Sequence, residues 1–147
     1  FAFVDALDEV TGYFGPGADF ATAVQRLGDE ARVVYFDGHS DYGRAFGRFA
    51  AEHLGRLGPR TTVIVTGDAR TNYRDPNLAA LEAIARHGRA LFWLNPERSA
   101  SWDSGDSVLG LYRPLCDGVH EVRTLRQLAA FVEQAALPAA RPLRRPG

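Results

Sequence analysis

Oxygen-bearing side chains follow three apolar runs of the sequence, each at the point where the run ends. These polar segments are 37–41 after the run 33–36, 67–73 after the run 62–66, and 95–96 after the run 90–94. Loops at the carboxyl ends of parallel strands meet at one edge of a sheet, so we expect these segments to lie close together. Hydroxyl and carboxylate oxygens, without cysteine or paired histidine, suit a hard cation such as Mg²⁺.

A simpler interpretation of the same residues stays open. Asp37 and Ser40 could do no more than cap the helix that follows them, and Asp68 could only shape a turn, since such local capping is common. The spacing by itself does not decide between a metal site and local capping.

The elements that would position these loops alternate between strand and helix. Strands are expected at 1–5, 33–36, 62–66, 90–94 and 119–122. One helix is expected to begin after Asp19, and four more are expected at 42–57, 75–86, 108–112 and 125–135. The run 62–66 is typical of a central strand buried on both faces. Asp75 and Pro76 are expected to cap the third of these helices, and Thr124 with Gln127 makes a capping box for the last one. This order predicts an α/β fold, doubly wound, with a mostly parallel sheet and helices on both faces.

Length and composition agree with one domain. The 147 residues are 46% apolar and 24% charged, and the net charge of -1 gives no reason to expect nucleic acid or membrane binding. No apolar run approaches the roughly 18 residues of a membrane helix. The single Cys116 excludes an intrachain disulfide. We expect a partial domain over 1–137 and a disordered tail over 138–147.

The beginning of the chain is unusual, because the sequence contains no methionine and opens at Phe1 in a strand-like run. A gene product starts with methionine and rarely begins inside a strand. We therefore expect the chain to be the carboxyl-terminal piece of a longer protein.

The blocks FDGHSDYGRAFGRF, VIVTGDARTNYRDP and LFWLNPE resemble von Willebrand factor A-like proteins of the CoxE type, over roughly residues 1–135. In that fold, three loops hold a divalent ion, usually Mg²⁺ and alternatively Mn²⁺: one supplies D-x-S-x-S, the second a Thr and the third an Asp. The resemblance implies that Ser40 stands at the Thr position and Asp68 at the Asp position. His39 and Ser40 depart from the usual Gly-Thr of the second loop.

The D-x-S-x-S motif is absent from these residues. By the resemblance, the first strand and first helix of the fold are missing, and the metal site is incomplete. We therefore predict weak or no Mg²⁺ binding by this chain alone.

The resemblance implies an interaction module and not an enzyme: a bound ion whose open position takes an Asp or Glu of another protein. It implies a MoxR-type AAA+ ATPase as partner, a client metalloenzyme such as a molybdenum carbon monoxide dehydrogenase, a role in its maturation, and the bacterial cytoplasm. The alternative is a Mg²⁺-dependent hydrolase or phosphotransferase that uses Asp37 or Asp68. The chain has no lysine, no phosphate-binding glycine motif and no nucleophile elbow, which disfavours that chemistry.

Other residues have two interpretations each. Arg70 and Arg74 could clamp a partner's carboxylate or a phosphate, or be exposed loop arginines. Trp102 could be an exposed recognition aromatic or a loop residue, and Asp103 and Asp106 could approach the edge of the sheet or only solvate their loop. Cys116 has no activating neighbour and is expected to be structural.

Overall fold

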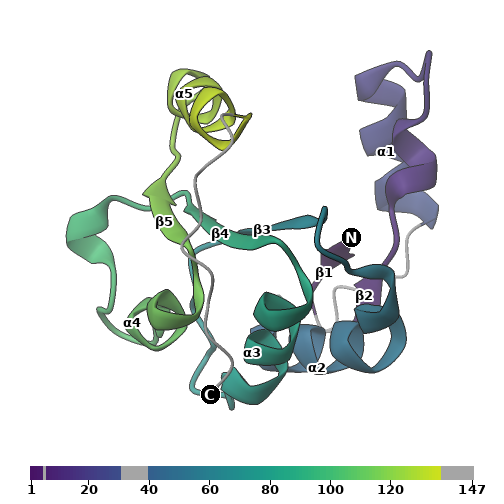
Figure 1. The fold of residues 1–147 in the computed structure, drawn as a ribbon. Helices are drawn as coiled ribbons and strands as arrows, with labels where there is room; N and C mark the ends of the chain where they lie inside the picture. Colours follow the sequence, from purple (N-terminus) through teal and green to yellow (C-terminus); the bar gives the residue numbers. More distant parts are fainter. Residues whose placement is uncertain (5, 31–39, 137–147) are drawn as a thin grey trace.

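The computed structural model describes residues 1–4, 6–30 and 40–136 of the chain. Figure 1 shows the order of the elements in space. The helices are α1 (Phe20–Glu30), α2 (Tyr42–His53), α3 (Leu78–His87), α4 (Leu109–Tyr112) and α5 (Leu125–Ala136). The strands are β1 (Ala2–Phe3), β2 (Leu7–Asp8), β3 (Thr62–Thr66), β4 (Ala90–Asn95) and β5 (Gly118–Glu121). Short 3-10 turns occupy Thr11–Phe14, Leu54–Arg56, Ser99–Ser101 and Arg113–Leu115.

Strands β3, β4 and β5 form a parallel three-stranded sheet in that order, with Ile64 opposite Phe92 and Phe92 opposite Gly118. Helices cover both faces of this sheet, with α5 on one face and α2, α3 and α4 on the other (Figure 1). The predicted α/β class with a parallel sheet and helices on two faces is therefore confirmed.

The main core lies between the sheet and α2, α3 and α4. Trp93 of β4 stacks on Tyr112 of α4, with ring centroids 4.9 Å apart, and Phe46 of α2 meets the Trp93 ring edge-on at 6.1 Å. The next residue along β4, Phe92, points to the opposite face and packs against Phe131 of α5. The alternation of Phe92 and Trp93 thus gives each layer of helices its own aromatic contact.

The prediction for the strand 62–66 is correct in its bounds and wrong in its burial. Among the described strands, β3 lies at one edge of the sheet, and Ile64 on the α5 face remains 48% exposed. β4 instead is the central strand, with Leu91 and Trp93 fully buried. Because both runs are β-branched or apolar throughout, composition alone did not distinguish the central strand from the outer one.

Helix α2 begins where the sequence predicts and ends early, at His53, where a 3-10 turn continues it to Arg56. Its cap is Asp41, whose carboxylate accepts the Arg44 N–H at 2.9 Å. Ser40 is therefore not the residue that caps this helix.

The predicted start of the third helix is wrong. α3 begins at Leu78, not at 75, and its cap is Asn77, which adopts a left-handed conformation (φ 48°) and accepts the Ala80 N–H. The Asp75 carboxylate is instead bound by the backbone N–H of Asn77 at 2.8 Å. Asp75 and Pro76 thus lie directly before the cap residue and outside the helix.

The last two helices follow the prediction. The short helix near 108–112 is α4. At α5, the Gln127 N–H donates to the Thr124 hydroxyl at 3.2 Å and the Thr124 N–H donates to the Gln127 side chain at 3.0 Å. This reciprocal pair is the predicted capping box.

The first residues form a small separate sheet. Of the described part of the predicted strand 1–5, Ala2–Phe3 is a strand, and it pairs antiparallel with Leu7–Asp8, which we did not predict. The predicted strand 33–36, and with it Asp37 and His39, lies outside the described residues.

Candidate functional site

The candidate site is built on the segment that leaves β3, and Gly67 fixes its path. A Cβ on Gly67 would overlap the hydroxyl oxygen of Tyr42, so a side chain cannot be accommodated here. The carbonyl of Gly67 accepts the indole N–H of Trp93 at 2.8 Å. Asp68 is therefore delivered to the edge of the sheet directly from the core.

One oxygen of the Asp68 carboxylate is held by two donors. Oδ1 accepts the Tyr42 hydroxyl at 3.1 Å and the Arg70 N–H at 3.0 Å. Among the residues that the structure describes, none donates to Oδ2. Asp68 thus has a fixed orientation and one oxygen available to a ligand.

Tyr42 is buried, and burial raises the pKa of its hydroxyl well above the usual range, with the charge of Asp68 adding to the shift. The hydroxyl is neutral at physiological pH and donates to the carboxylate. It also accepts the N–H of the fully buried Ala69 at 3.3 Å. The Tyr42 side chain therefore positions both the Asp68 carboxylate and the Ala69 backbone in the turn after β3.

Ser40 lies beside this turn. Its carbonyl oxygen accepts the side-chain N–H of Asn72 at 3.3 Å, and it precedes Tyr42 by two residues. The structure thus brings the two predicted metal-site residues, Ser40 and Asp68, to the same part of the molecule. Both line one cavity, which we call the slot.

The slot lies between the β1–β2 hairpin and β3 and has a volume of about 800 Å³. Every residue of β3 lines it on one side, Phe1, Ala2 and Phe3 line it on the other, and Phe46 and Phe49 of α2 lie beneath. In the part of the chain that the structure describes, β3 pairs only with β4, so its second edge faces the slot. The slot is mainly apolar in its lining, and Ser40 and Asp68 contribute polar atoms to it.

The loop after β4 supports Asp68 from the other side. Asn95 is fully buried, and its side-chain N–H donates to the Asp68 carbonyl at 3.2 Å while its side-chain oxygen accepts the Glu97 N–H at 2.8 Å. Asn95 therefore holds the Asp68 backbone in place, and the adjacent Pro96 lines the slot.

Arg70 has neither of the two predicted roles. Its guanidinium binds Glu97 through two hydrogen bonds of 3.0 and 2.9 Å, and donates to Asp106 and to the Ser104 carbonyl at 3.0 Å each. The hydrogen bonds that Arg70 donates to Glu97, and next those to Asp106, raise the pKa of Arg70, and Arg70 in turn lowers the pKa of Asp106. Arg70 ties the 97–107 segment to the turn after β3 and is not available as a clamp.

The remaining candidates are also placed. Arg74 is 41% exposed and pairs with Asp41 at 3.3 Å. Trp102 is not an exposed aromatic, since it is partly buried against the core and its indole N–H donates to the Glu97 carbonyl. Asp106 does approach the site, because it also accepts the Asn72 N–H at 3.0 Å, whereas Asp103 accepts the Gly110 N–H. Burial raises the pKa of Cys116 to about 11, as expected of a structural thiol.

Two residues at the site were missed. Asn72 connects the Ser40 segment to Asp106, and Tyr73 beside it is 87% exposed. Both have positive φ, of 53° and 61°. The Asn gives a weak sequence signal for such a conformation, and the Tyr gives none.

The donor chemistry of Ser40 and Asp68 fits a hard cation, since both offer oxygen and Asp68 keeps one carboxylate oxygen unbound. No cluster of three or more His, Cys, Asp or Glu side chains suited to a metal occurs in the described residues. Mg²⁺ takes few carboxylates and retains waters, so two residues could hold part of its shell but not complete it.

Comparison with known proteins gives one match. The family model "VWA domain containing CoxE-like protein" matches residues 1–131. No curated protein and no solved structure matches the chain. No helix among the described residues is long and apolar enough to cross a membrane. The match covers most of the chain and agrees with the parallel sheet and its flanking helices, so this chain belongs to the CoxE-like family of von Willebrand factor A domain proteins.

Proposed function

We propose that the chain is a metal-dependent protein-interaction module that acts with a MoxR-type AAA+ ATPase. Its family implies a role linked to the maturation or assembly of carbon monoxide dehydrogenase, and CoxE-like proteins are generally accessory proteins without catalysis. We further propose a molybdenum-containing client and a cytoplasmic location. The metal-dependent binding is supported by the placement of Ser40 and Asp68 on one slot, with an unbound carboxylate oxygen of Asp68.

Ser40 and Asp68 would hold the ion, through a hydroxyl and a carboxylate oxygen. Bound Mg²⁺ or Mn²⁺ supplies a positive charge with an exchangeable coordination position, which suits an Asp or Glu of a second protein. Tyr42 and Asn95 keep the Asp68 side chain and carbonyl in place before any ligand arrives. Such preorganisation lowers the ordering cost of binding.

The slot suggests where the remaining ligands originate. We infer that an extended segment pairs with the free edge of β3 and carries the D-x-S-x-S oxygens to the end at which Ser40 and Asp68 lie. The length of β3, the apolar lining and the polar end of the slot all suit such a segment. Finding the motif in native sequence upstream of Phe1 would support this inference, and an upstream sequence without it would count against it.

Nothing observed favours the alternative hydrolase or phosphotransferase. Phosphate chemistry needs a cation near the carboxylate, whereas the chain has no lysine, and Arg70, two residues after Asp68, is bound to Glu97 and Asp106.

The direct test measures binding of the purified ATPase to this protein, including any native sequence before Phe1, by calorimetry with Mg²⁺ and with a chelator. We expect the chelator and Asp68→Asn each to weaken binding at least about tenfold, with the melting temperature of the variant little changed. Asp29→Asn, an exposed carboxylate on α1, is the control. Metal-independent binding, or phosphatase turnover abolished by Asp68→Asn, would refute the proposal.

A further inference from the structure

Tyr73 occupies a backbone position that is unfavourable for its type. The Arg74 N–H donates to the Thr71 carbonyl at 3.0 Å, which closes a β-turn with Asn72 and Tyr73 at its centre. Both central residues have positive φ, as in a type I′ turn, where Gly, Asn and Asp are favoured. Asn72 suits its position, whereas a bulky side chain at Tyr73 is an outlier.

Nothing within the described part of the chain compensates for this conformation. The Tyr73 side chain is 87% exposed and makes no hydrogen bond, ion pair or ring contact with another described residue. The turn is nevertheless held firmly, because Thr71 is buried and the Asn72 N–H is bound by Asp106. Strained residues that persist in a rigid setting are concentrated at functional sites.

The surroundings of Tyr73 indicate what it could meet. Asn72 links its turn to Ser40, so Tyr73 lies next to the candidate metal site. Arg74 and Arg44 line a hollow of about 230 Å³ on the same side. Both acidic side chains of that hollow already have partners. Asp41 forms an ion pair with Arg74 and accepts the Arg44 N–H, and Asp75 accepts the Asn77 N–H.

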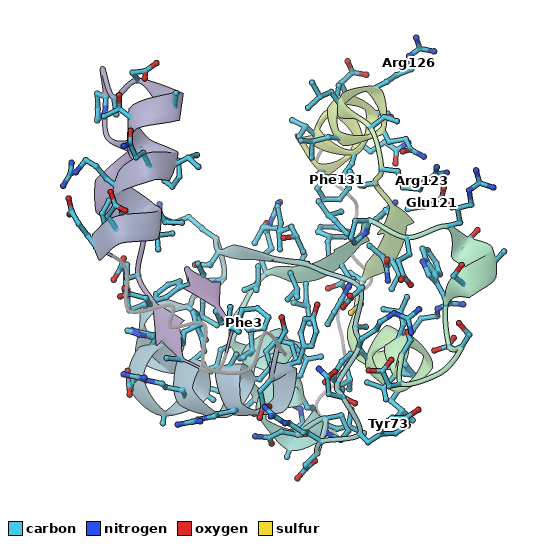
Figure 2. All side chains as sticks on the ribbon, turned by 180° about the vertical axis from the view of Figure 1, so that it is seen from behind. Phe3, Tyr73, Glu121, Arg123, Arg126 and Phe131 are labelled. Carbon is cyan, nitrogen blue, oxygen red and sulfur yellow. The ribbon has the colours of Figure 1, made fainter. Side chains whose placement is uncertain are left out.

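The Arg44 guanidinium, in contrast, has no ion pair with a described residue. Figure 2 shows Tyr73 at the end of the molecule opposite Arg126 of α5. Tyr73 is followed directly by Arg74, which lines the same hollow as Arg44, and this end of the molecule lies far from the exposed apolar residues on α5.

We propose that Tyr73 is the aromatic anchor of a protein-docking surface, formed with Arg44 and Arg74, that binds a partner presenting a carboxylate beside a pocket for the ring. Tyrosine and arginine dominate the energetics of such interfaces, and a rigid ring loses little entropy on binding. The identification of the partner as the MoxR-type ATPase rests on the proposed function.

Nucleic acid is the less favoured occupant of this surface. An exposed ring next to an arginine could stack on a base, but the neighbouring hollow contains as many aspartates as arginines, and the chain has a net charge of -1. Binding of single strands requires a positively charged groove.

The test compares wild type, Tyr73→Gly, Tyr73→Phe and Asp68→Asn in the calorimetric assay with the ATPase, together with thermal unfolding. Leu125→Ala on α5 is the control for loss of an exposed apolar side chain. We expect Tyr73→Gly to weaken binding at least tenfold while its melting temperature is no lower than that of wild type, because glycine accepts positive φ. Tyr73→Phe and Leu125→Ala should bind within about threefold of wild type.

The outcomes separate this proposal from the proposed function. Wild-type affinity of Tyr73→Gly beside a loss in Asp68→Asn would overturn the docking surface alone. Metal-independent binding that is still lost in Tyr73→Gly would overturn the metal-dependent function and support the surface. Failure of the wild type to bind the ATPase would overturn both. Retention of a single-stranded DNA probe by wild type but not Tyr73→Gly would overturn the surface in favour of nucleic acid.

Discussion

Tyr42 connects the hydrophobic core to the candidate site through one hydroxyl group. Its ring packs between Phe3 and Trp93, at centroid distances of 5.0 and 5.5 Å, and its hydroxyl bonds Asp68 and Ala69. The position of Asp68 therefore depends on how well the core packs, since a shift of the ring would move the donor with it.

The Tyr42→Phe variant tests this connection. The ring would stay packed, but the N–H of buried Ala69 would lose its acceptor, and we expect the free energy of unfolding to fall by about 1–3 kcal/mol. Urea unfolding measures the change. Tyr73→Phe removes an exposed hydroxyl and should change stability by less than about 0.5 kcal/mol. Equal effects of the two substitutions would show that the Tyr42 hydroxyl does not support the turn.

Residue roles were only partly predictable from the sequence. Tyr42 was correctly predicted as the first residue of a helix, because apolar residues recur at helical spacing from there onward. The partner of its hydroxyl depends on a residue 26 positions away and has no local signal. The ion pairs of Arg70 depend in the same way on residues more than 25 positions away.

At the scale of elements, the 97–107 segment is held to the turn after β3 by Arg70. The hydrogen bond from this guanidinium lowers the pKa of Asp106. The folded protein is therefore more stable when the Asp106 carboxylate is ionised than when it is protonated. The stabilisation is fully present above the ordinary aspartate pKa of about 3.9 and is lost as the pH falls through the lower value of the folded state.

We therefore expect the difference in unfolding free energy between wild type and Asp106→Asn to be largest at pH 7 and to shrink below about pH 4. Urea unfolding at pH 7, 4 and 3 measures it. Glu133→Gln, an exposed change on α5, should show a small difference at every pH. A difference for Asp106→Asn that does not vary with pH would mean that the ion pair contributes nothing.

Helix α2 and the segment before α3 approach each other closely at Gly43. A Cβ at this position would overlap the Asp75 carbonyl oxygen, and the Gly43 carbonyl accepts the side-chain N–H of Asn77. The contact explains why α3 starts late: Asp75 and Pro76 lie against α2, and Asn77 turns the chain into the helix. The prediction from Asp75 and Pro76 relied on residue preferences at helix starts, which do not include this tertiary contact.

Gly43→Ala should consequently destabilise the protein by about 3 kcal/mol, since backbone must move to admit the methyl group. Gly55→Ala provides the comparison, because nothing lies within 4 Å of a Cβ there and the substitution should be neutral or mildly stabilising. Thermal or urea unfolding distinguishes the two. Equal stability of both variants would refute the close approach.

At the scale of the whole molecule, the described chain contains two sheets with the slot between them. The alternation of elements predicted the parallel sheet and its two helical layers, because that signal is repeated along the chain. It could not predict the hairpin, whose strands have two residues each, or the exposure of β3, which depends on what lies beside it.

Amide hydrogen exchange tests the free edge of β3. We expect the amides of Thr62–Thr66 to exchange faster than those of Ala90–Asn95, since within the described residues β4 pairs with a strand on both sides and β3 on one side. Mass spectrometry of the two peptides provides the comparison. Equal protection would mean that another segment already covers the slot.

The strand that borders the slot also affects how this polypeptide behaves at high concentration. Its sequence, Thr-Val-Ile-Val-Thr, has no charge and no proline, and half of the Ile64 side chain is in water. None of the described strands pairs with its second edge. An unpaired edge of this kind is a template for intermolecular pairing, so the chain should aggregate progressively as its concentration rises. A lysine in place of Ile64 would act as a gatekeeper and should keep the protein monodisperse.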